Sequence, residues 1–313
     1  MRHVVLVDTD LPAMIATMID PSLELRRWPE DAPPKVLQAA VGIFTYGHPR
    51  IDDALLDQTP AVRVVSNFGV GVDHIDLAAA QRHGVVVGNT PHLVDGATAD
   101  MTMALLLAVA RNLVIGDHYA RSSAFTHFDP SILIGSEVYG TTIGIVGMGN
   151  VGRQVARRAR GFDMHILYHN RRRDFPAEAA LDAHYRSLPD LLAEADYVTL
   201  NMPLTNETRG MIGREQLALM KPTAFLINAA RGGVVDHLAL YEALQTNQIA
   251  GAALDVTEPE PLPRNHPLLA LENLVIAPHL GSATRQTRAA MARMAIDNLL
   301  AGIAGRPLLS RVI

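Results

Sequence analysis

Three glycines, Gly147, Gly149 and Gly152, follow the apolar run "TIGIV" and precede the helical pattern "RQVARRAR". The first glycine permits a tight turn, the second lets a pyrophosphate approach the backbone, and the third allows the helix and the strand to pack closely. The N-terminus of the helix would supply unpaired N–H donors to the phosphates. Because a strand precedes the glycines and a helix follows them, a dinucleotide site explains them better than a coincidental turn does.

The residues after the next strand indicate which dinucleotide. An acidic residue usually stands about 20 positions after such a turn and holds the ribose hydroxyls of NAD. This chain has Asn170 there, followed by Arg171, Arg172 and Arg173. Asparagine does not repel a 2′-phosphate, and guanidinium groups make charge-assisted contacts with phosphate oxygens. We therefore expect NADP(H) to be preferred, with NAD(H) possible and Arg171 and Arg172 as the contacts. The alternative is a solvated basic loop.

Three further polar residues stand where predicted strands end. Arg231 follows "FLINAA", Glu260 lies in "LDVTEPEPLP", and His279 follows "NLVIAP". Each alone is more simply explained as a helix cap, a loop carboxylate or a core histidine. Because ligands of open α/β sheets bind at the carboxyl ends of the strands, the three together beside a dinucleotide site indicate hydride transfer to a 2-oxo acid.

The elements that must position these residues follow the pattern of a parallel sheet covered by helices. Short β-branched runs alternate with helical stretches, first from "HVVLVD" to "GVVVGNT" and again from about residue 140 to "NLVIAPHL". This pattern predicts an α/β fold of two Rossmann-like doubly wound domains, one flavodoxin-like and one dinucleotide-binding, with a cleft between them. We expect a substrate and catalytic domain from residues 1–98 and 282–313, and a dinucleotide-binding domain from residues 99–281. The helix "TRQTRAAMARMAIDNLLAGIAG" should return to the first domain.

The composition limits the classes of function. The chain has 313 residues, no cysteine and a formal net charge of −5, with no long block of one sign. These features exclude disulfides and thiolate catalysis, and they give no electrostatic reason to expect nucleic acid or a membrane as partner. The most apolar segment, 101–110, is too short to cross a bilayer, which needs about 20 residues. We expect a cytoplasmic protein with a small-molecule partner and no metal site.

An ordered run of motifs resembles the D-2-hydroxyacid dehydrogenase family, and more closely its glyoxylate/hydroxypyruvate reductases. The motifs are "SNFGVGVDHID", "GIVGMGNVG", "INAARGGVVD", "LDVTEPEPLPRNHPLL" and "PHLGSAT". The resemblance covers nearly the whole chain. It implies that a hydride moves between C4 of the nicotinamide and C2 of the substrate, with Arg231, Glu260 and His279 as the catalytic set.

Chemistry then suggests a role for each residue of this set. Arg231 can clamp the substrate carboxylate, and His279 can give a proton to the carbonyl oxygen or take one in the reverse direction. Glu260 would hydrogen-bond the other imidazole nitrogen and favour the charged ring. By resemblance, the backbone N–H groups of Val70 and Gly71 meet the substrate carboxylate from the opposite side.

The resemblance also implies further residues along the cofactor. Asp255 would accept a hydrogen bond from the nicotinamide carboxamide, whereas Thr102 is almost as well explained as a helix-packing hydroxyl. The full cofactor set comprises Thr102, Gly147, Gly149, Asn150, Val151, Gly152, Asn170, Arg171, Arg172, Met202, Pro203, Thr208, Ala229, Ala230, Arg231, Asp255, His279 and Gly281.

The chain departs from the family pattern at several positions. His237 and Asn201 stand where many relatives have glutamate and histidine. Phe125 and Phe128 occupy a segment where hydroxypyruvate-reducing relatives often carry tryptophan, in a loop that reaches the partner subunit's site. Trp28, the only tryptophan, lies elsewhere. The preferred 2-oxo acid therefore stays open among glyoxylate, hydroxypyruvate, a keto-sugar acid and an aryl pyruvate.

The leading hypothesis is an NADPH-dependent 2-oxo acid reductase that forms a homodimer through its cofactor domains. An NAD-dependent hydroxyacid oxidiser is the main alternative among enzymes, and a relative acting on phosphite or formate is disfavoured. A different class is also open, because dehydrogenase-like transcriptional corepressors keep this fold and even its catalytic residues. Nothing in the sequence resembles a partner-docking tail.

Overall fold

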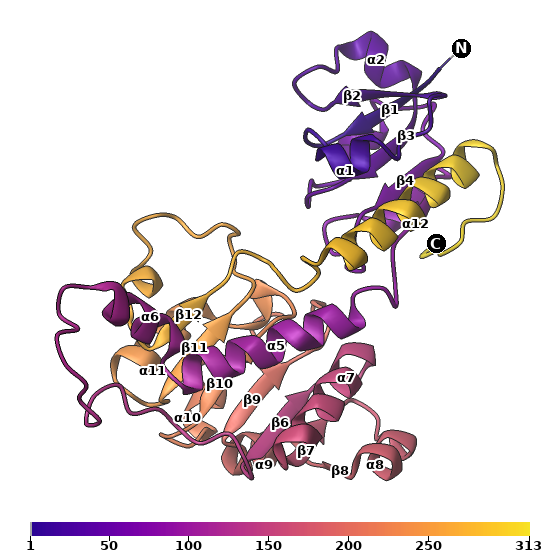
Figure 1. Ribbon diagram of the computed structural model, residues 1–313. Coiled ribbons are helices and arrows are strands. Elements are labelled where there is room, and N and C mark those ends of the chain that lie inside the picture. The colour runs from indigo at the N-terminus through magenta and orange to yellow at the C-terminus, as the bar shows by residue number, and fades with distance from the viewer. Residues whose placement is uncertain (1) are drawn as a thin grey trace. The chain divides into compact units, whose positions relative to one another are not determined.

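The computed structural model describes residues 2–313, and the chain divides into two compact units (Figure 1). The first unit consists of Met1–Val94 and Thr284–Ile313, and the second of Asp95–Ala283. Each contains one all-parallel sheet with helices on both faces. The fold class expected from the sequence, two doubly wound α/β domains, is confirmed.

The first unit has a five-stranded sheet of order β2-β1-β3-β4-β5. This order is the flavodoxin-like one. The strands are β1 (His3–Val7), β2 (Leu23–Arg27), β3 (Ala40–Thr45), β4 (Val64–Asn67) and β5 (Val86–Gly88), and the helices are α1 (Ala13–Ala16), α2 (Pro34–Ala39), α3 (Asp53–Leu56), α4 (Leu77–Arg82) and α12 (Arg285–Ile303).

Helix α12 packs on one face of this sheet, although it lies about 200 residues from β5 in sequence. Its buried residues Ala295, Leu299 and Ile303 join a cluster with strand residues such as Phe44 and Val64. The helix lies so close that a Cβ atom at Gly302 would come within 2.5 Å of the Val64 side chain. Helices α2, α3 and α4 contribute to the cluster on the opposite face.

The second unit has a seven-stranded sheet of order β12-β11-β10-β9-β6-β7-β8. The strands are β6 (Thr142–Val146), β7 (His165–His169), β8 (Ala183–Tyr185), β9 (Tyr197–Leu200), β10 (Phe225–Asn228), β11 (Gly251–Leu254) and β12 (Leu274–Ile276). The helices are α5 (Asp95–Ala110), α6 (Leu113–Arg121), α7 (Asn150–Ala159), α8 (Phe175–Leu181), α9 (Leu188–Glu194), α10 (Arg214–Leu219) and α11 (His237–Gln245), with 3-10 turns at Arg160–Phe162, Gly232–Val234 and Pro267–Ala270.

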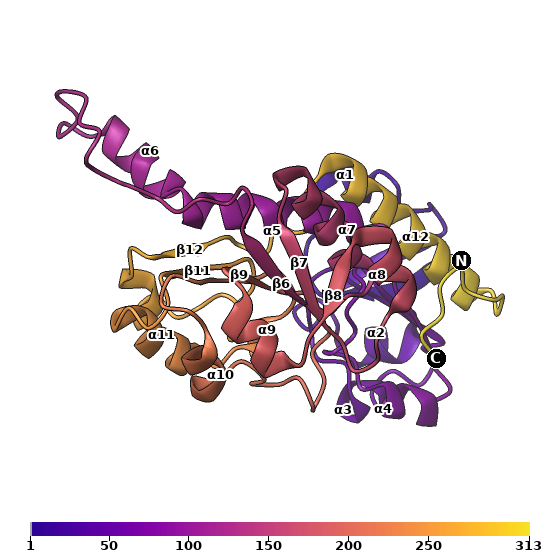
Figure 2. The same cartoon turned by 90° about the horizontal axis from the view of Figure 1, so that it is seen from below.

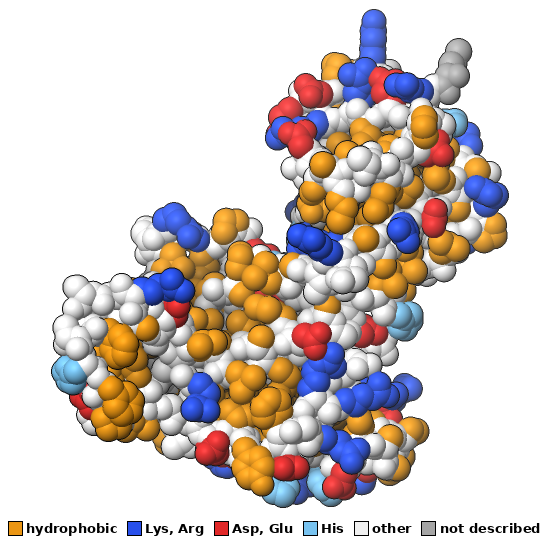
Figure 3. Space-filling view, viewed as in Figure 1, with side chains coloured by type: hydrophobic (Ala, Val, Ile, Leu, Met, Phe, Trp, Pro, Cys, Tyr) orange, Lys and Arg blue, Asp and Glu red, His pale blue; other side chains and the backbone are white. Residues whose placement is uncertain are grey.

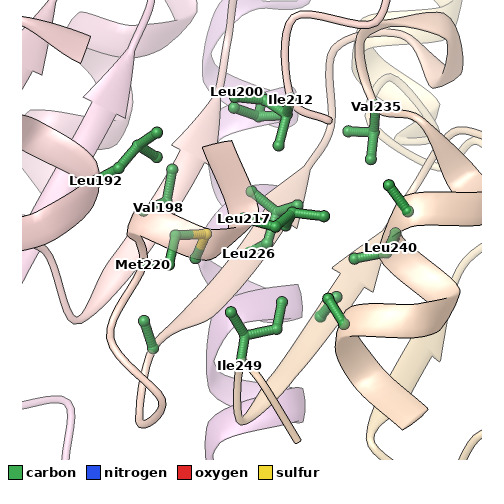
Figure 4. Close-up of a cluster of buried hydrophobic side chains, with 14 of the residues drawn as sticks. Leu192, Val198, Leu200, Ile212, Leu217, Met220, Leu226, Val235, Leu240 and Ile249 are labelled. Carbon is green, nitrogen blue, oxygen red and sulfur yellow. The ribbon is translucent and has the colours of Figure 1, made fainter. Parts of the chain in front are cut away.

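Two hydrophobic clusters hold the helices on this sheet. Helices α9, α10 and α11 pack on one face through residues such as Leu192, Leu217 and Leu240 (Figure 4). Helices α5, α7 and α8 pack on the other face, where Leu106 and Val155 are fully buried. Because both faces are covered, alternate residues of each strand are buried on opposite sides, and the strands read as apolar runs.

The register of the second sheet sets the place of the functional residues. Val146 pairs with Leu200, Leu200 with Asn228, Asn228 with Leu254, and Leu254 with Ile276. Each of these residues is the last of its strand, so the strand ends form one row at the carboxyl edge of the sheet. The chain reverses strand order between β6 and β9, and ligands of open α/β sheets bind at such a point.

The structure also shows elements that the sequence did not predict. The expected helix "GATADMTMALLLAVARNL" ends at Ala110, because Asn112 adopts a left-handed conformation with φ of 51° and a second helix, α6, starts at Leu113. The edge strands β2 and β8 were not predicted either. Within residues 2–313 no single helix is long and apolar enough to cross a membrane, and only α5 and α6 together, bent by 61°, meet the length and composition required.

Candidate active site

The glycine turn connects β6 to α7 and has the geometry that phosphate binding needs. Gly147 has φ of +99°, and a Cβ atom there would come within 2.8 Å of the backbone of Asn201. A Cβ atom at Gly152 would overlap the carbonyl oxygen of Gly147. At Gly149, by contrast, a Cβ atom would have no neighbour within 4 Å. The turn therefore leaves open space beside the N-terminus of α7, and its residues fit a dinucleotide.

Asn170, directly after β7, braces this turn. Its side-chain oxygen accepts a hydrogen bond from the backbone N–H of Met148 at 2.8 Å. Of the arginines that follow, Arg173 forms an ion pair with Glu178 at 2.6 Å. The Tyr168 hydroxyl also donates a hydrogen bond to the Glu178 carboxylate. The hydrogen bonds from Arg173 and Tyr168 together lower the pKa of Glu178 to about 2. Arg171 and Arg172 form no ion pair within the described part of the chain.

His279 and Glu260 form a hydrogen-bonded pair. The Nδ1 atom of His279 lies 2.6 Å from Oε1 of Glu260. The other carboxylate oxygen of Glu260 accepts from the backbone N–H of Thr257 at 3.2 Å. Because Nδ1 faces the carboxylate, this contact orients the imidazole ring of His279. The sequence placed these residues on separate strand-end loops, and the structure brings them together.

Asp255 holds the backbone on which His279 stands. It directly follows β11 and is almost fully buried. Its two carboxylate oxygens accept from the backbone N–H groups of Leu280 and Gly281, at 2.6 and 2.7 Å. His279 adopts φ of +57°, which is unusual for a residue with a Cβ atom. Burial raises the pKa of Asp255, while the two N–H donors oppose that shift.

Arg231 lies in the loop after β10, and Asn228 shapes that loop. The fully buried Asn228 side chain accepts from the N–H of Ala230 at 3.0 Å and donates to the carbonyl of Arg231 at 2.9 Å. Sequence reasoning missed Asn228 as a site residue. The signal was an asparagine that ends a strand two residues before a tight turn, since asparagine side chains commonly bond the backbone two residues ahead.

The loop that carries Glu260 packs tightly on the turn after Arg231. A Cβ atom at Gly232 would overlap the backbone of Thr257. His237, one of the departures from the family pattern, lies with its Nδ1 atom 3.1 Å from the carbonyl oxygen of Glu258. Because that oxygen can only accept, Nδ1 carries the proton. Burial lowers the pKa of His237, because it disfavours the charged ring.

The remaining cofactor residues predicted in the second unit lie mostly near the carboxyl ends of its strands. Asn150 and Val151 begin α7, whereas Met202, Pro203, Ala229 and Gly281 lie in the loops that follow β9, β10 and β12. The Thr208 hydroxyl donates to the carbonyl of Pro203 at 2.7 Å and braces the loop after β9. Thr102 differs, because it is fully buried in α5 and its hydroxyl donates to the carbonyl of Thr98 at 2.9 Å. That geometry favours its helix-packing explanation.

Val70 and Gly71 belong to the first unit, in the loop after β4. The carbonyl groups of this loop accept from the side-chain amides of Asn67 and Asn89. Neither asparagine was among the residues predicted from the sequence. The described residues contain no cluster of three or more metal-ligating side chains.

Comparison with known proteins places this geometry in a family. Residues 103–281 match the model of the D-isomer specific 2-hydroxyacid dehydrogenase NAD-binding domain. The chain belongs to the D-isomer specific 2-hydroxyacid dehydrogenase family. The resemblance drawn from the sequence motifs is thus confirmed, and the protein is an NAD(P)-dependent oxidoreductase.

Named relatives of this dehydrogenase agree over nearly its whole length. A protein named glyoxylate reductase from Thermococcus kodakarensis is 46% identical over 311 residues, which cover 96% of this chain and 93% of the relative. A solved structure of a protein from Thermus thermophilus has a TM-score of 0.91 and 44% identity, covering 99% of this chain and 100% of that one.

A third comparison concerns a structure with a bound cofactor. It is the NADPH-dependent glyoxylate/hydroxypyruvate reductase of Sinorhizobium meliloti in complex with NADP and malonate. Its TM-score is 0.87 at 31% identity, over 100% of this chain and 97% of that one. These comparisons support a nicotinamide dinucleotide as the cofactor of this dehydrogenase.

Proposed function

We propose that this dehydrogenase uses NADPH to reduce a small 2-oxo acid, such as glyoxylate or hydroxypyruvate, to the D-2-hydroxy acid. The observation that carries the proposal is the pair of His279 and Glu260, 2.6 Å apart, in loops that leave the same edge of the sheet as the glycine turn. A histidine oriented by a carboxylate is suited to proton exchange near neutral pH. The names of the relatives support the substrate class.

Each residue of the proposed site would have a distinct role in the reduction. Arg231, together with the N–H groups of Val70 and Gly71 in the first unit, would hold the carboxylate and so orient the neighbouring carbonyl. His279 would donate the Nε2 proton to the carbonyl oxygen, and Glu260 would stabilise the charged ring beforehand. When bound, the reduced nicotinamide supplies the hydride that adds to C2. The product is a hydroxyl group whose proton came from His279.

The preference for NADPH rests on the residues after β7. Asn170 is uncharged, so no carboxylate repels a 2′-phosphate at this position. Its side-chain oxygen accepts a hydrogen bond from the N–H of Met148. Arg173 is already paired with Glu178. We therefore assign the 2′-phosphate contacts to Arg171 and Arg172, whose side chains are exposed.

Two further expectations belong to this proposal. The second unit would be the dinucleotide-binding domain and the first the substrate domain, acting in the cytoplasm on a small-molecule substrate. The working form would be a homodimer built through the second unit. Support for the dimer comes from an arm formed by α6 and residues 122–139, which projects from the rest of that unit (Figure 2).

A kinetic panel tests the proposed function. We would measure kcat/KM with NADPH and NADH, each against glyoxylate, hydroxypyruvate and phenylpyruvate. Wild type should reduce at least one acid and prefer NADPH. The double variant Arg171→Ala, Arg172→Ala should lower that preference about tenfold or more, since hydrogen bonds to charged groups contribute roughly 1.5–3 kcal/mol each. Arg214→Ala, an exposed arginine of α10, is the matched control and should change nothing.

The other outcomes are equally informative. Equal rates with both cofactors, unchanged in the double variant, would contradict the NADPH assignment and favour an NAD-dependent hydroxyacid dehydrogenase. No turnover of any acid by wild type would contradict the reductase proposal and favour the nucleotide-binding corepressor.

A further inference from the structure

The three successive carbonyl groups of the loop Gly69-Val70-Gly71 all accept hydrogen bonds from asparagine side chains. The side-chain amide of Asn67 donates to the carbonyl oxygens of Gly69 at 3.0 Å and Gly71 at 2.9 Å. The side-chain amide of Asn89 donates to the carbonyl oxygen of Val70 at 2.9 Å. Three successive carbonyls are thus held by two asparagines from different parts of the first unit.

These hydrogen bonds fix the directions of the Val70 and Gly71 N–H groups. A trans peptide unit is planar, and its C=O and N–H point in opposite directions. The carbonyl of Gly69 shares its plane with the N–H of Val70, and the carbonyl of Val70 shares its plane with the N–H of Gly71. Asn67 therefore helps to set the direction of the Val70 N–H, together with the backbone N–H of Thr90, which donates to the same Gly69 carbonyl at 3.0 Å, and Asn89 sets the direction of the Gly71 N–H.

Both asparagines are themselves held by further hydrogen bonds. Asn67 is almost fully buried, and its oxygen accepts from the Thr45 hydroxyl at 2.7 Å. The oxygen of Asn89 accepts from the hydroxyl of Ser310 at 2.7 Å. Neither side-chain amide can flip by 180°. A flip would place its oxygen next to a carbonyl oxygen, which is also an acceptor, and would lose the hydrogen bond from the hydroxyl.

Ser310 lies in a segment that runs along the edge of the sheet. Val312 donates its N–H to the carbonyl of Val87 in β5 at 2.8 Å, and Arg311 bridges Gly88 in antiparallel fashion. The backbone N–H of Ser310 donates to the side chain of Asn298 in α12 at 3.1 Å. Ser310 is therefore linked by hydrogen bonds, through Asn89, to the loop after β4.

We propose that Asn67, Asn89 and Ser310 are positioning residues for substrate binding: they hold the N–H groups of Val70 and Gly71 in the direction that receives the substrate carboxylate. The inference rests on the proposed function, which places the carboxylate at these two N–H groups. It adds that Ser310 contributes to the affinity for the acid through Asn89, without touching either ligand.

The test compares Asn89→Ala, Ser310→Ala and Ser310→Thr with Leu309→Ala, an exposed neighbour of Ser310. Four quantities are measured: KM and kcat for glyoxylate at saturating NADPH, the inhibition constant of oxamate (an unreactive 2-oxo acid analogue), the Kd of NADPH from nucleotide fluorescence, and Tm. Asn89→Ala should raise KM and the oxamate constant about tenfold, the effect of misdirecting one hydrogen bond to a charged group.

The remaining quantities separate positioning from general damage. The value of kcat and the Kd of NADPH should stay within about twofold of wild type, because the contact is made equally in the ground and transition states. Ser310→Ala should shift KM in the same direction by about threefold, a loss typical of one neutral hydrogen bond. Ser310→Thr, which keeps the hydroxyl, should restore KM, and Leu309→Ala should match wild type.

An unchanged KM in folded Asn89→Ala would overturn the inference while leaving the reductase proposal intact. A joint change in KM, kcat and the Kd of NADPH would also overturn it, because it would indicate general damage. If Asn89→Ala does not fold, Ser310→Ala decides, and an unchanged KM there would overturn it. If wild type reduces no 2-oxo acid, the proposed function fails and this inference falls with it.

Discussion

Two of the three proposed catalytic side chains, His279 and Arg231, stand on backbone held by a buried polar residue. Asp255 fixes the turn that carries His279, and Asn228 fixes the loop that carries Arg231. Both supporting residues are buried, where an unmade hydrogen bond would cost roughly 1–3 kcal/mol. The positions of the reacting groups are therefore set by well-satisfied networks rather than by exposed loop contacts.

The sequence was sufficient to predict the candidate catalytic residues, but it did not predict the residues that hold their backbone in place. Arg231, Glu260 and His279 follow apolar runs and belong to side-chain types that exchange protons or bind acids, so pattern and resemblance found them. The side-chain amides of Asn67, Asn89 and Asn228 each donate to backbone carbonyl groups. Those groups come within reach only through turn geometry and the pairing of distant segments, neither of which one sequence specifies.

Replacing the proposed proton donor should be the most damaging single change. For His279→Asn we expect kcat to fall on the order of 10²–10⁴-fold, the usual contribution of a positioned general acid. Glu260→Gln keeps the shape of the side chain but removes the charge that favours the imidazolium, so its effect should be smaller. Steady-state kinetics measures both.

The matched control is His184→Asn, an exposed histidine of β8. The Kd of NADPH should change little in His279→Asn and in Glu260→Gln. A loss of activity that came entirely from weaker cofactor binding would contradict the assigned roles.

The alternation of strands and helices made the fold predictable at the scale of elements. Apolar runs bounded by turn residues marked the central strands of both sheets, because strands buried on both faces have few polar residues. The missed strands lie at sheet edges: β2 is rich in charged residues and β8 has only three residues. Helix α6 was missed because it buries none of its residues and so lacks a core-facing pattern.

The glycine turn allows two substitutions with different expected outcomes. Gly152→Ala would overlap the carbonyl of Gly147 and force α7 away from β6, so we expect a lower Tm and a loss of about 1–3 kcal/mol in unfolding free energy, as for overpacking. Gly149→Ala meets no protein atom, so Tm should hold while the Kd of NADPH rises, because the methyl group enters the space left for the pyrophosphate.

Gly161→Ala serves as the control, since a Cβ atom there also has no neighbour within 4 Å and the residue lies outside the turn. Thermal unfolding and nucleotide fluorescence measure the two properties. Equal NADPH affinity in Gly149→Ala and wild type would show that the pyrophosphate does not approach the backbone at this position.

For the molecule as a whole, the arm of the second unit suggests assembly. It exposes several large apolar side chains, among them Phe128 at 82% and Ile134 at 76% of their surface. Hydrophobic side chains gather over this region in Figure 3. A cavity of about 250 Å³ lies at the base of the arm, lined by residues including Val114, Ile134 and Leu274. Contiguous exposed apolar surface of this kind usually marks an interaction site.

The proposed homodimer can be tested in solution. Wild type should sediment as a dimer, and Phe128→Ser combined with Ile134→Ser should shift the equilibrium to monomer, because two apolar anchors are lost. Leu238→Ser removes a side chain that is 65% exposed on α11 and should leave the dimer intact. A wild-type monomer at micromolar concentration would contradict the proposal.

The aligned strand ends of the second sheet have a consequence for how such an enzyme can change. Leu200, Asn228 and Leu254 share one register, and a separate loop leaves each of them. Any one loop can lengthen, shorten or exchange residues while the ladder beneath it stays paired. Substitutions in these loops, in nature or in the laboratory, can therefore alter what the enzyme binds while the paired strands keep their arrangement.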